Sequence, residues 1–379
     1  MLLSRGLPRL SPTSLPSPSS LLAHRSMSSS SSLRKPVSLL TPSQLAPLFK
    51  KDSKVKCFDA SWFMPGVERD GFREWRKCRV PHSGFWHLDQ ISSDSDVGVP
   101  HNIPSKELFE DACSRLGIER DDHVVFYDTH GVFSSPRAAF TFHHFSHPLI
   151  SILDGGLPRW QAEGYPVTTT TPVNPNPHKI LAEGEEKERY QGVFSELLYA
   201  TKPRVESYFI ADIEELFTDY KVPEGAELSD VRQFKDVMEV LEKEEGEGRN
   251  AAVVDARPEG RFTGSSAEPR PGLSSGHMPG AFNVPSPAVL SEPTSTEPSY
   301  KTLKSPEELE GVFKNALGEE QWKKVKEGER PVLTSCGSGM TAAIVWLALQ
   351  RTGVTDNVSI YDESWTGYAQ RPEAKIVKD

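Results

Sequence analysis

Short apolar runs of four to six residues recur along the chain, and each run ends in a polar residue. They are rich in Val, Ile and Phe, and longer segments of helical character separate them. Such runs are typical of parallel strands that are buried on both faces of a sheet. The strands predicted in this way are 56–59, 123–128, 150–154, 252–255, 331–336 and 358–362. The pattern therefore predicts an α/β fold, with parallel sheets flanked by helices.

The six predicted strands fall into two sets of three, one in each half of the chain. Asp128 and Asp154 end two successive strands and are 26 residues apart, and Cys336 and Asp362 are also 26 residues apart. An equal interval across a strand–helix–strand unit is hard to obtain by chance. The spacing indicates that one α/β unit occurs twice.

Proline and threonine interrupt the pattern between the two sets. The stretch Thr168–Pro172 and the nearby Pro175–Pro177 fit neither a helix nor a central strand. We expect a first domain over residues 52–167, a linker over 168–208 and a second domain over 209–379. Residues 1–51 are expected to lie outside both domains.

The first 51 residues have the composition of a mitochondrial transit peptide. They contain seven Lys and Arg, many Ser, and no Asp or Glu. We expect a mitochondrial protein, with a disordered tail as the plainer alternative and a cytoplasmic form starting at Met27 as a second product. Without the seven basic residues the formal net charge goes from −10 to −17, which disfavours direct binding of nucleic acid. The chain has no run of 18 apolar residues, so we expect no membrane span.

Four cysteines stand at positions 57, 78, 113 and 336, without a CxxC pair. Their spacing favours neither a zinc site nor a disulfide framework, and we expect no metal and no cofactor. Cys336 differs from the others because it ends a predicted strand and is followed by Gly337, Gly339 and a helical segment that closes near Gly353.

The Cys336 loop suits an anion. Glycines allow a tight turn with φ > 0, so that successive N–H groups and the free N–H groups of the next helix converge. A thiolate or persulfide there is stabilised relative to its neutral form. The plainer alternative is a buried cysteine that acts as a small apolar residue. A cysteine-dependent phosphatase would need an arginine at the far end of the loop, and positions 342 and 343 are both Ala.

The motif Cys336–Ala342, Cys-Gly-Ser-Gly-Met-Thr-Ala, resembles the active loop of mercaptopyruvate sulfurtransferases, which belong to the tandem rhodanese family. The overall pattern over about residues 52–372 is similar to fungal thiosulfate/3-mercaptopyruvate sulfurtransferases. Further segments carry the likeness, namely 58–62, 134–137, 153–157, 255–262, 268–270, 276–281 and 360–366. Residues 79–83 and 87–89 depart from the family pattern. The resemblance implies two tandem rhodanese-like domains, the first without catalytic activity because Asp128 stands where Cys336 does.

The resemblance also implies roles for individual residues. Cys336 would be the nucleophile, and Ser338, Asp89 and His101 would assist proton transfer. The donor would be held by Arg261 and Arg270 together with the loop residues Gly337, Gly339, Met340 and Thr341. Arginine suits a 2-oxo acid because its planar fork can bind a carboxylate through two hydrogen bonds. Each of these residues also has a plainer interpretation, such as a surface arginine, a turn aspartate or a helix-capping threonine.

The implied reaction moves sulfur from 3-mercaptopyruvate to an acceptor through a Cys336 persulfide and releases pyruvate. Thiosulfate is expected to be the poorer donor, because thiosulfate-preferring relatives carry Arg-Lys after the cysteine and this loop has the neutral pair Gly337 and Ser338. Acceptors would be thioredoxin, another thiol or cyanide. The alternative is a sulfur-relay protein in tRNA thiolation, loaded by a cysteine desulfurase and serving a sulfur-carrier protein.

Overall fold

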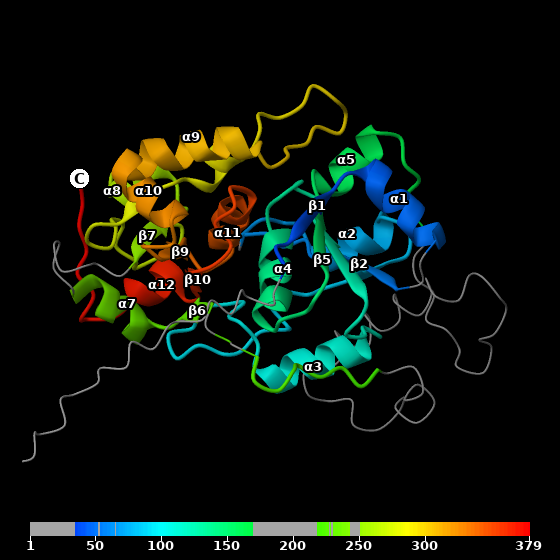
Figure 1. Ribbon diagram of the computed structural model, residues 1–379, viewed down its shortest axis with the longest axis horizontal. Helices are drawn as coiled ribbons and strands as arrows, with labels where there is room; N and C mark the ends of the chain where they lie inside the picture. Colours follow the sequence, from blue (N-terminus) through cyan, green and yellow to red (C-terminus); the bar gives the residue numbers. More distant parts are fainter. Residues whose placement is uncertain are drawn as a thin grey trace, which may run out of the picture. The chain divides into compact units, whose positions relative to one another are not determined.

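Two five-stranded parallel sheets form the framework of the protein in the computed structural model (Figure 1). The structure describes residues 35–51, 54–64, 66–169, 218–226, 228, 230–242 and 251–379. The first sheet has the order β1-β5-β4-β2-β3 and the second β6-β10-β9-β7-β8, with every pairing parallel. The strands are β1 (Ser38–Leu40), β2 (Val55–Asp59), β3 (Ser83–Phe85), β4 (His123–Tyr127), β5 (Ile150–Leu153), β6 (Val231–Arg232), β7 (Ala252–Asp255), β8 (Phe282–Asn283), β9 (Val332–Ser335) and β10 (Val358–Tyr361).

Helices lie between the strands and flank both sheets (Figure 1). In the first half they are α1 (Pro42–Lys51), α2 (Gly71–Lys77), α3 (Lys106–Arg115), α4 (Ser135–His144) and α5 (Gly156–Ala162). In the second half they are α7 (Phe234–Glu242), α8 (Glu259–Thr263), the 3-10 helix η3 (Ser286–Val289), α9 (Pro306–Leu317), α10 (Glu319–Lys326), α11 (Ala342–Arg351) and α12 (Ser364–Tyr368). The expected α/β fold with two domains is confirmed.

All six strands predicted from apolar runs are present, and they form the centres of the sheets. Every residue of β5, β7, β9 and β10 is buried, as expected for parallel strands covered on both faces. The strands that the sequence did not reveal are β1, β3, β6 and β8. These have only two or three residues each, too few for a hydrophobic period to show.

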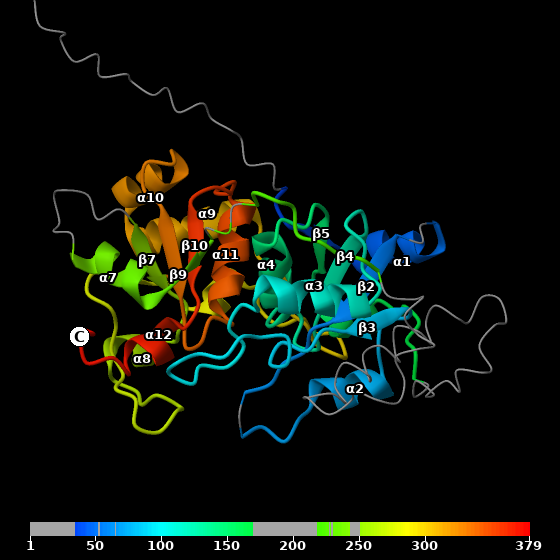
Figure 2. The same ribbon diagram turned by 90° about the horizontal axis from the view of Figure 1, so that it is seen from below.

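The two halves are packed together through α4 and α11, which lie side by side in Figures 1 and 2. All residues of α4 and residues 342–350 of α11 are buried, and Phe140 meets Trp346 edge to face with ring centroids 5.0 Å apart. A helix that is hydrophobic all round must be covered on all sides. This explains why α11, the helix after the Cys336 loop, is the most uniformly apolar segment of the second half.

The expected domain boundaries need correction at two places. Residues 38–40 form β1, an edge strand of the first sheet, and residues 42–51 form α1. The first domain therefore starts well before residue 52. The boundary was placed too late because an amphipathic helix without acidic residues, such as α1, has the same composition as a transit peptide. Thr168 pairs with Arg79, and Thr218 and Val222 bond to α3, so these residues belong to the first half. Most of the predicted linker 168–208 lies outside the described residues.

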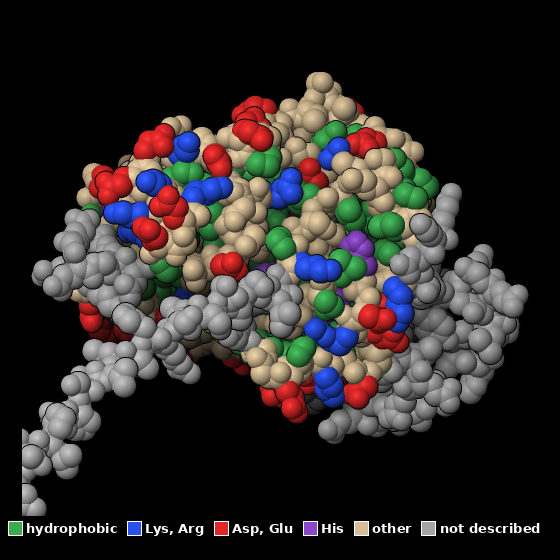
Figure 3. Space-filling view, in the orientation of Figure 1, with side chains coloured by type: hydrophobic (Ala, Val, Ile, Leu, Met, Phe, Trp, Pro, Cys, Tyr) green, Lys and Arg blue, Asp and Glu red, His purple; other side chains and the backbone are tan. Residues whose placement is uncertain are grey.

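No helix among the described residues is both long and apolar enough to span a bilayer. On the face shown in Figure 3, acidic and basic side chains are interspersed over α9 and α10. Pairs such as Lys324 with Glu320 and Lys326 with Glu310 account for this mixture. This face therefore has no single-sign field of the kind that attracts a polyanion.

Candidate active site

The loop that follows β9 carries Cys336, whose side chain is 2% exposed. The Cys336 N–H donates to Ser364 Oγ at 3.0 Å, and its carbonyl accepts from Trp365 N–H at 2.9 Å. The Gly337 carbonyl accepts from both the N–H and the hydroxyl of Thr366, at 2.9 and 2.6 Å. These bonds hold the loop carbonyls against α12. Among the described residues, the N–H groups of 337–341 have no hydrogen-bond acceptor.

The two loop glycines serve different purposes. Gly339 has φ +81°, and a Cβ there would lie 2.7 Å from the Asp362 carbonyl oxygen. Gly337 has no positive φ. A Cβ at Gly337 would instead lie 3.3 Å from Arg261 Nη2 and 3.8 Å from Arg270 Nη1. The expectation that both glycines provide φ > 0 therefore holds for Gly339 only, and Gly337 makes room for two guanidinium groups.

The first domain has a corresponding loop after β4, and the carboxylate of Asp128 lies in it. The Asp128 carboxylate accepts the N–H groups of His130, Phe133, Ser134 and Ser135 at 2.9–3.0 Å, and the Ser135 hydroxyl at 2.7 Å. A glycine with φ +107° stands three residues after Asp128, just as Gly339 stands three residues after Cys336. The chain thus contains one copy of this loop whose N–H groups converge on a negative charge.

Two arginines lie against the Cys336 loop. Arg261 of α8 donates through Nε and Nη2 to Glu268 Oε2, and its side chain is 18% exposed. Arg270 donates through Nη1 to Thr366 Oγ1 at 3.0 Å, while its Nη2 is buried and has no protein partner among the described residues. Burial lowers the pKa of the Arg270 guanidinium, and the nearby Cys336 partly offsets this. Buried guanidinium donors of this kind are suited to an anionic ligand.

His101 joins the two halves at the cysteine loop. Its Nε2 is 2.9 Å from Ser338 Oγ, and its Nδ1 is 3.0 Å from Asp89 Oδ1. An ionised carboxylate can only accept, so Nδ1 carries the proton and Nε2 accepts from the Ser338 hydroxyl. Burial lowers the pKa of His101, although the hydrogen bond to Asp89 opposes this. Burial raises the pKa of Asp89, but the hydrogen bonds from His101 and Trp62 outweigh it and lower that pKa overall.

Comparisons with known proteins show the family of the chain. The rhodanese-like domain family matches residues 71–163 and 237–371. The chain belongs to the rhodanese-like family. It is an enzyme of the sulfurtransferase class, as its relatives are.

Two curated relatives illustrate the likeness. The mitochondrial thiosulfate/3-mercaptopyruvate sulfurtransferase 1 of Arabidopsis thaliana is 33% identical over 86% of this chain and 74% of its own length. The probable 3-mercaptopyruvate sulfurtransferase of Schizosaccharomyces pombe is 31% identical over 90% of this chain and 95% of its own.

Two solved structures show the same architecture. A sub-stoichiometric sulfur transferase subunit of yeast mitochondrial complex I has a TM-score of 0.66 at 31% identity, over 90% of this chain and 98% of the other. A 3-mercaptopyruvate sulfotransferase of Escherichia coli has a TM-score of 0.62 at 25% identity, over 87% of this chain and 99% of the other.

The structure of this rhodanese-like chain brings most of the predicted site residues together. Ser338 touches His101, His101 touches Asp89, and the two arginines lie over Gly337. The Met340 side chain is buried in the hydrophobic core, which leaves its backbone N–H for ligand binding. The Thr341 hydroxyl makes no capping bond, so the plainer interpretation of a helix-capping threonine is not supported.

The other three cysteines lie in surroundings unlike those of Cys336. Cys57 lies in β2 and Cys113 in α3, both fully buried, and burial raises the pKa of each thiol. Cys78 is half-buried, and burial raises its pKa as well. All four thiols are free. Cys57 therefore belongs to the core of the first half.

Sequence reasoning missed the residues that hold the site in place. Arg137 is fully buried, pairs with Asp362 and donates to the His101 carbonyl at 2.9 Å. Asp362 also accepts the Ile103 N–H at 2.8 Å. Trp62 donates its indole N–H to Asp89 at 2.9–3.0 Å. The motifs around Arg137 and Trp62 were visible in the sequence, but the contact of Arg137 with Asp362, 225 residues away, was not.

Proposed function

We propose that the protein moves sulfur from 3-mercaptopyruvate, and less readily from thiosulfate, to a thiol or cyanide acceptor through a Cys336 persulfide, releasing pyruvate. One observation carries this proposal. In the loop that begins at Cys336, the N–H groups of residues 337–341 have no acceptor among the described residues, and two guanidinium groups lie against Gly337. The N–H groups of the matching loop in the first domain bind the Asp128 carboxylate. Relatives that share most of the chain are named for these two donors.

In the first half-reaction, Arg261 and Arg270 bind the donor carboxylate and carbonyl. The Cys336 thiolate attacks the donor sulfur, so an S–S bond forms and the C–S bond breaks. The electron pair of the C–S bond passes to the carbon and gives the enolate of pyruvate, whose charge the guanidinium groups stabilise. The proton of the donor thiol ends on the enolate carbon, which completes pyruvate.

Ser338, His101 and Asp89 are the groups that we assign to this proton transfer. The Ser338 hydroxyl gives its proton to His101 Nε2 as it takes one from the donor sulfur, and the ionised Asp89 holds the Nδ1–H in place. A neutral imidazole is required for this step, and the lowered pKa of His101 keeps it neutral near neutral pH.

In the second half-reaction, an acceptor thiolate attacks the outer sulfur of the persulfide. A new S–S bond forms on the acceptor and the Cys336 thiolate is released, ready for another donor. Thioredoxin-like and other thiols, or cyanide, have the chemistry to act as acceptor. No metal or cofactor takes part in either half-reaction.

A Cys336→Ser variant tests the proposal. We expect it to lose pyruvate release from 3-mercaptopyruvate while keeping the fold, since Ser and Cys are close in size. Mass spectrometry of wild-type protein mixed with the donor should find one extra sulfur atom on the peptide that contains Cys336. Cys78→Ser, which changes a half-buried cysteine outside the site, is the matched control and should keep full turnover.

Two other results would reject the proposal. Persistent turnover in Cys336→Ser would show that the sulfur travels elsewhere. Wild-type protein that gains sulfur only from a cysteine desulfurase, and releases no pyruvate from 3-mercaptopyruvate, would instead be the sulfur-relay protein.

A mitochondrial location is part of the proposal, with a second, cytoplasmic product from Met27. The structure limits where a transit peptide can end, because Val37 N–H donates to Gln350 Oε1 and residues 38–40 form the edge strand β1. A cut at residue 51 would remove that strand and α1, so we place the cut before Val37.

A further inference from the structure

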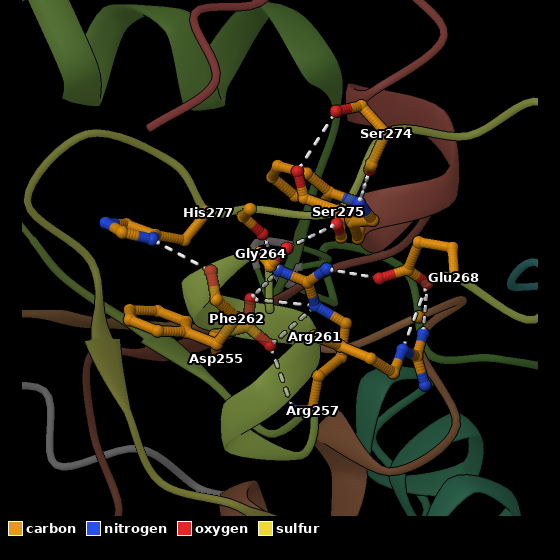
Figure 4. A network of polar contacts seen from close by, with 12 residues as sticks. Asp255, Arg257, Arg261, Phe262, Gly264, Glu268, Ser274, Ser275 and His277 are labelled. Carbon is orange, nitrogen blue, oxygen red and sulfur yellow. Dashed lines mark hydrogen bonds and ion pairs between the residues drawn. The ribbon is translucent and has the colours of Figure 1, made fainter. Parts of the chain in front are cut away.

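Four charged side chains of alternating sign form a row beside the cysteine loop (Figure 4). Asp255 ends β7, and its carboxylate accepts hydrogen bonds from Nε and Nη2 of Arg257. Arg257 Nη1 donates to Glu268 Oε1 at 2.7 Å, and Arg261 donates to Glu268 Oε2. The first three side chains are 1–2% exposed, and Arg257 also lies 4.1 Å over the Trp365 ring. Charges buried this deeply have to be matched by partners.

Glu268 connects this row to the donor site. It accepts from two guanidinium groups at once, one through each oxygen, and Figure 4 shows it between them. Arg261 is the outer member of the row, and its Nη2 lies beside Gly337 together with Nη1 of Arg270. Glu268 therefore sits next to a donor-binding cation without reaching the loop itself.

The formal charges around the loop can be added in pairs. Asp255 cancels Arg257, and Glu268 cancels Arg261. Arg137 and Asp362, which lie beside Gly339, cancel each other in the same way. The remaining charges nearest the donor are the positive Arg270 and the Cys336 thiolate of the proposed mechanism, while the ionised Asp89 lies farther away, behind His101. Two arginines beside the donor thus supply close to one net positive charge before the thiolate is counted, and close to zero after it.

We propose that Glu268 sets the charge preference of the donor site, by neutralising Arg261 so that a monoanionic donor is favoured over a dianion. This inference rests on the function proposed above. A dianion gains about twice as much as a monoanion from each added positive charge, so a site with less positive charge loses more affinity for thiosulfate than for 3-mercaptopyruvate. Donor specificity is the difference between the affinities for thiosulfate and for 3-mercaptopyruvate, and a fixed negative charge lowers the affinity for thiosulfate more.

Glu268→Gln tests this inference, because it removes the charge and keeps the shape. We expect the ratio of kcat/KM for thiosulfate to kcat/KM for 3-mercaptopyruvate to rise about tenfold, as one unit charge gives at roughly 10 Å through an effective dielectric of about 20. The ratio is measured on one preparation, so any inactive fraction cancels. High salt should reduce the change.

Two controls separate charge from structure. Glu268→Asp keeps the charge and should leave the ratio near that of the wild type. Glu259→Gln removes an exposed carboxylate from α8, the helix that carries Arg261, and should also leave the ratio unchanged. An equal loss for both donors in Glu268→Gln would overturn the inference and leave Glu268 a structural residue.

Arg261→Gln provides a second route should Glu268→Gln fail to fold. Its side chain is partly exposed, and it leaves Glu268 paired with Arg257. The ratio should then fall, because positive charge has been removed beside the donor. A ratio that stays constant or rises would reject charge control of donor choice. Failure of the proposed function is a separate outcome, in which wild-type protein turns over neither donor.

Discussion

Asp128 and Cys336 stand at the same point of two similar loops, and they show what one residue decides. The carboxylate of Asp128 takes up the N–H donors of its own loop, whereas the N–H groups after Cys336 have no acceptor among the described residues. From the sequence, we predicted roles for Cys336, Asp89, His101, Ser338 and both arginines. These predictions rest on short local motifs, which could not show that Ser338 and His101 are in contact.

At the residue scale, Asp89→Asn tests the assigned proton transfer. The carboxylate raises the pKa of His101 against burial, so its removal should lower that pKa further. Activity needs neutral His101, which is lost as pH falls through its pKa. The acid limb of kcat should therefore move to lower pH, and kcat should fall by about tenfold or more because a neutral amide oxygen holds the Nδ1–H less strongly than the carboxylate and does not stabilise the imidazolium formed during proton transfer. A pH profile of pyruvate release measures both effects.

Asp94→Asn is the control for this variant, because Asp94 is an exposed carboxylate of the same loop. Its profile should match that of the wild type. An acid limb that moved to higher pH in Asp89→Asn would contradict the assignment.

At the scale of elements, the central strands and α11 were predictable because each has a strong local signal. A buried parallel strand has a run of apolar residues, and α11 has an apolar sequence that ends before a glycine. The edge strands β1, β3, β6 and β8 were not predictable. These segments are extended because each pairs with a strand that is distant in sequence, as Ser38 of β1 pairs with Ser151 of β5.

Gly339→Ala tests the loop between β9 and α11. Alanine there would have φ +81° and a Cβ 2.7 Å from the Asp362 carbonyl oxygen, so the loop must shift. We expect a loss of about 1–3 kcal/mol in the free energy of unfolding and at least a tenfold loss of turnover. Denaturant melts and pyruvate release measure the two quantities.

Gly353→Ala is matched to that variant. Gly353 has φ +87° at the end of α11, but a Cβ there would find only Lys326 Nζ, at 3.9 Å. It should lose about 1 kcal/mol of stability and keep its turnover. Equal losses of turnover in both variants would mean that the shape of the cysteine loop is not what matters.

At the scale of the whole molecule, the site exists only where the two halves meet. Arg137 of α4 pairs with Asp362 after β10, and both side chains are at most 4% exposed. The same guanidinium group holds the His101 carbonyl. The pair therefore fixes the contact between the halves and the position of His101 together.

Arg137→Met should leave the Asp362 carboxylate buried without its cation. We expect about 3–5 kcal/mol lower stability, together with reduced turnover as His101 loses its anchor. Urea denaturation followed by tryptophan fluorescence gives the first quantity. Lys323→Met, which breaks an exposed pair with Glu327, should change stability by less than about 1 kcal/mol. A similarly small effect for Arg137→Met would show that this ion pair does not stabilise the contact between the halves.

The shared strand order of the two sheets is what a duplicated gene would produce, and Asp128 shows how the copies then diverged. A copy without a cysteine at this point of its loop would ordinarily be free to accumulate changes. Here the loop that bears Asp89 and His101 reaches Ser338 of the other copy, so changes in the first copy alter the surroundings of Cys336 in the second. Selection on a single cysteine therefore acts on both halves of the chain.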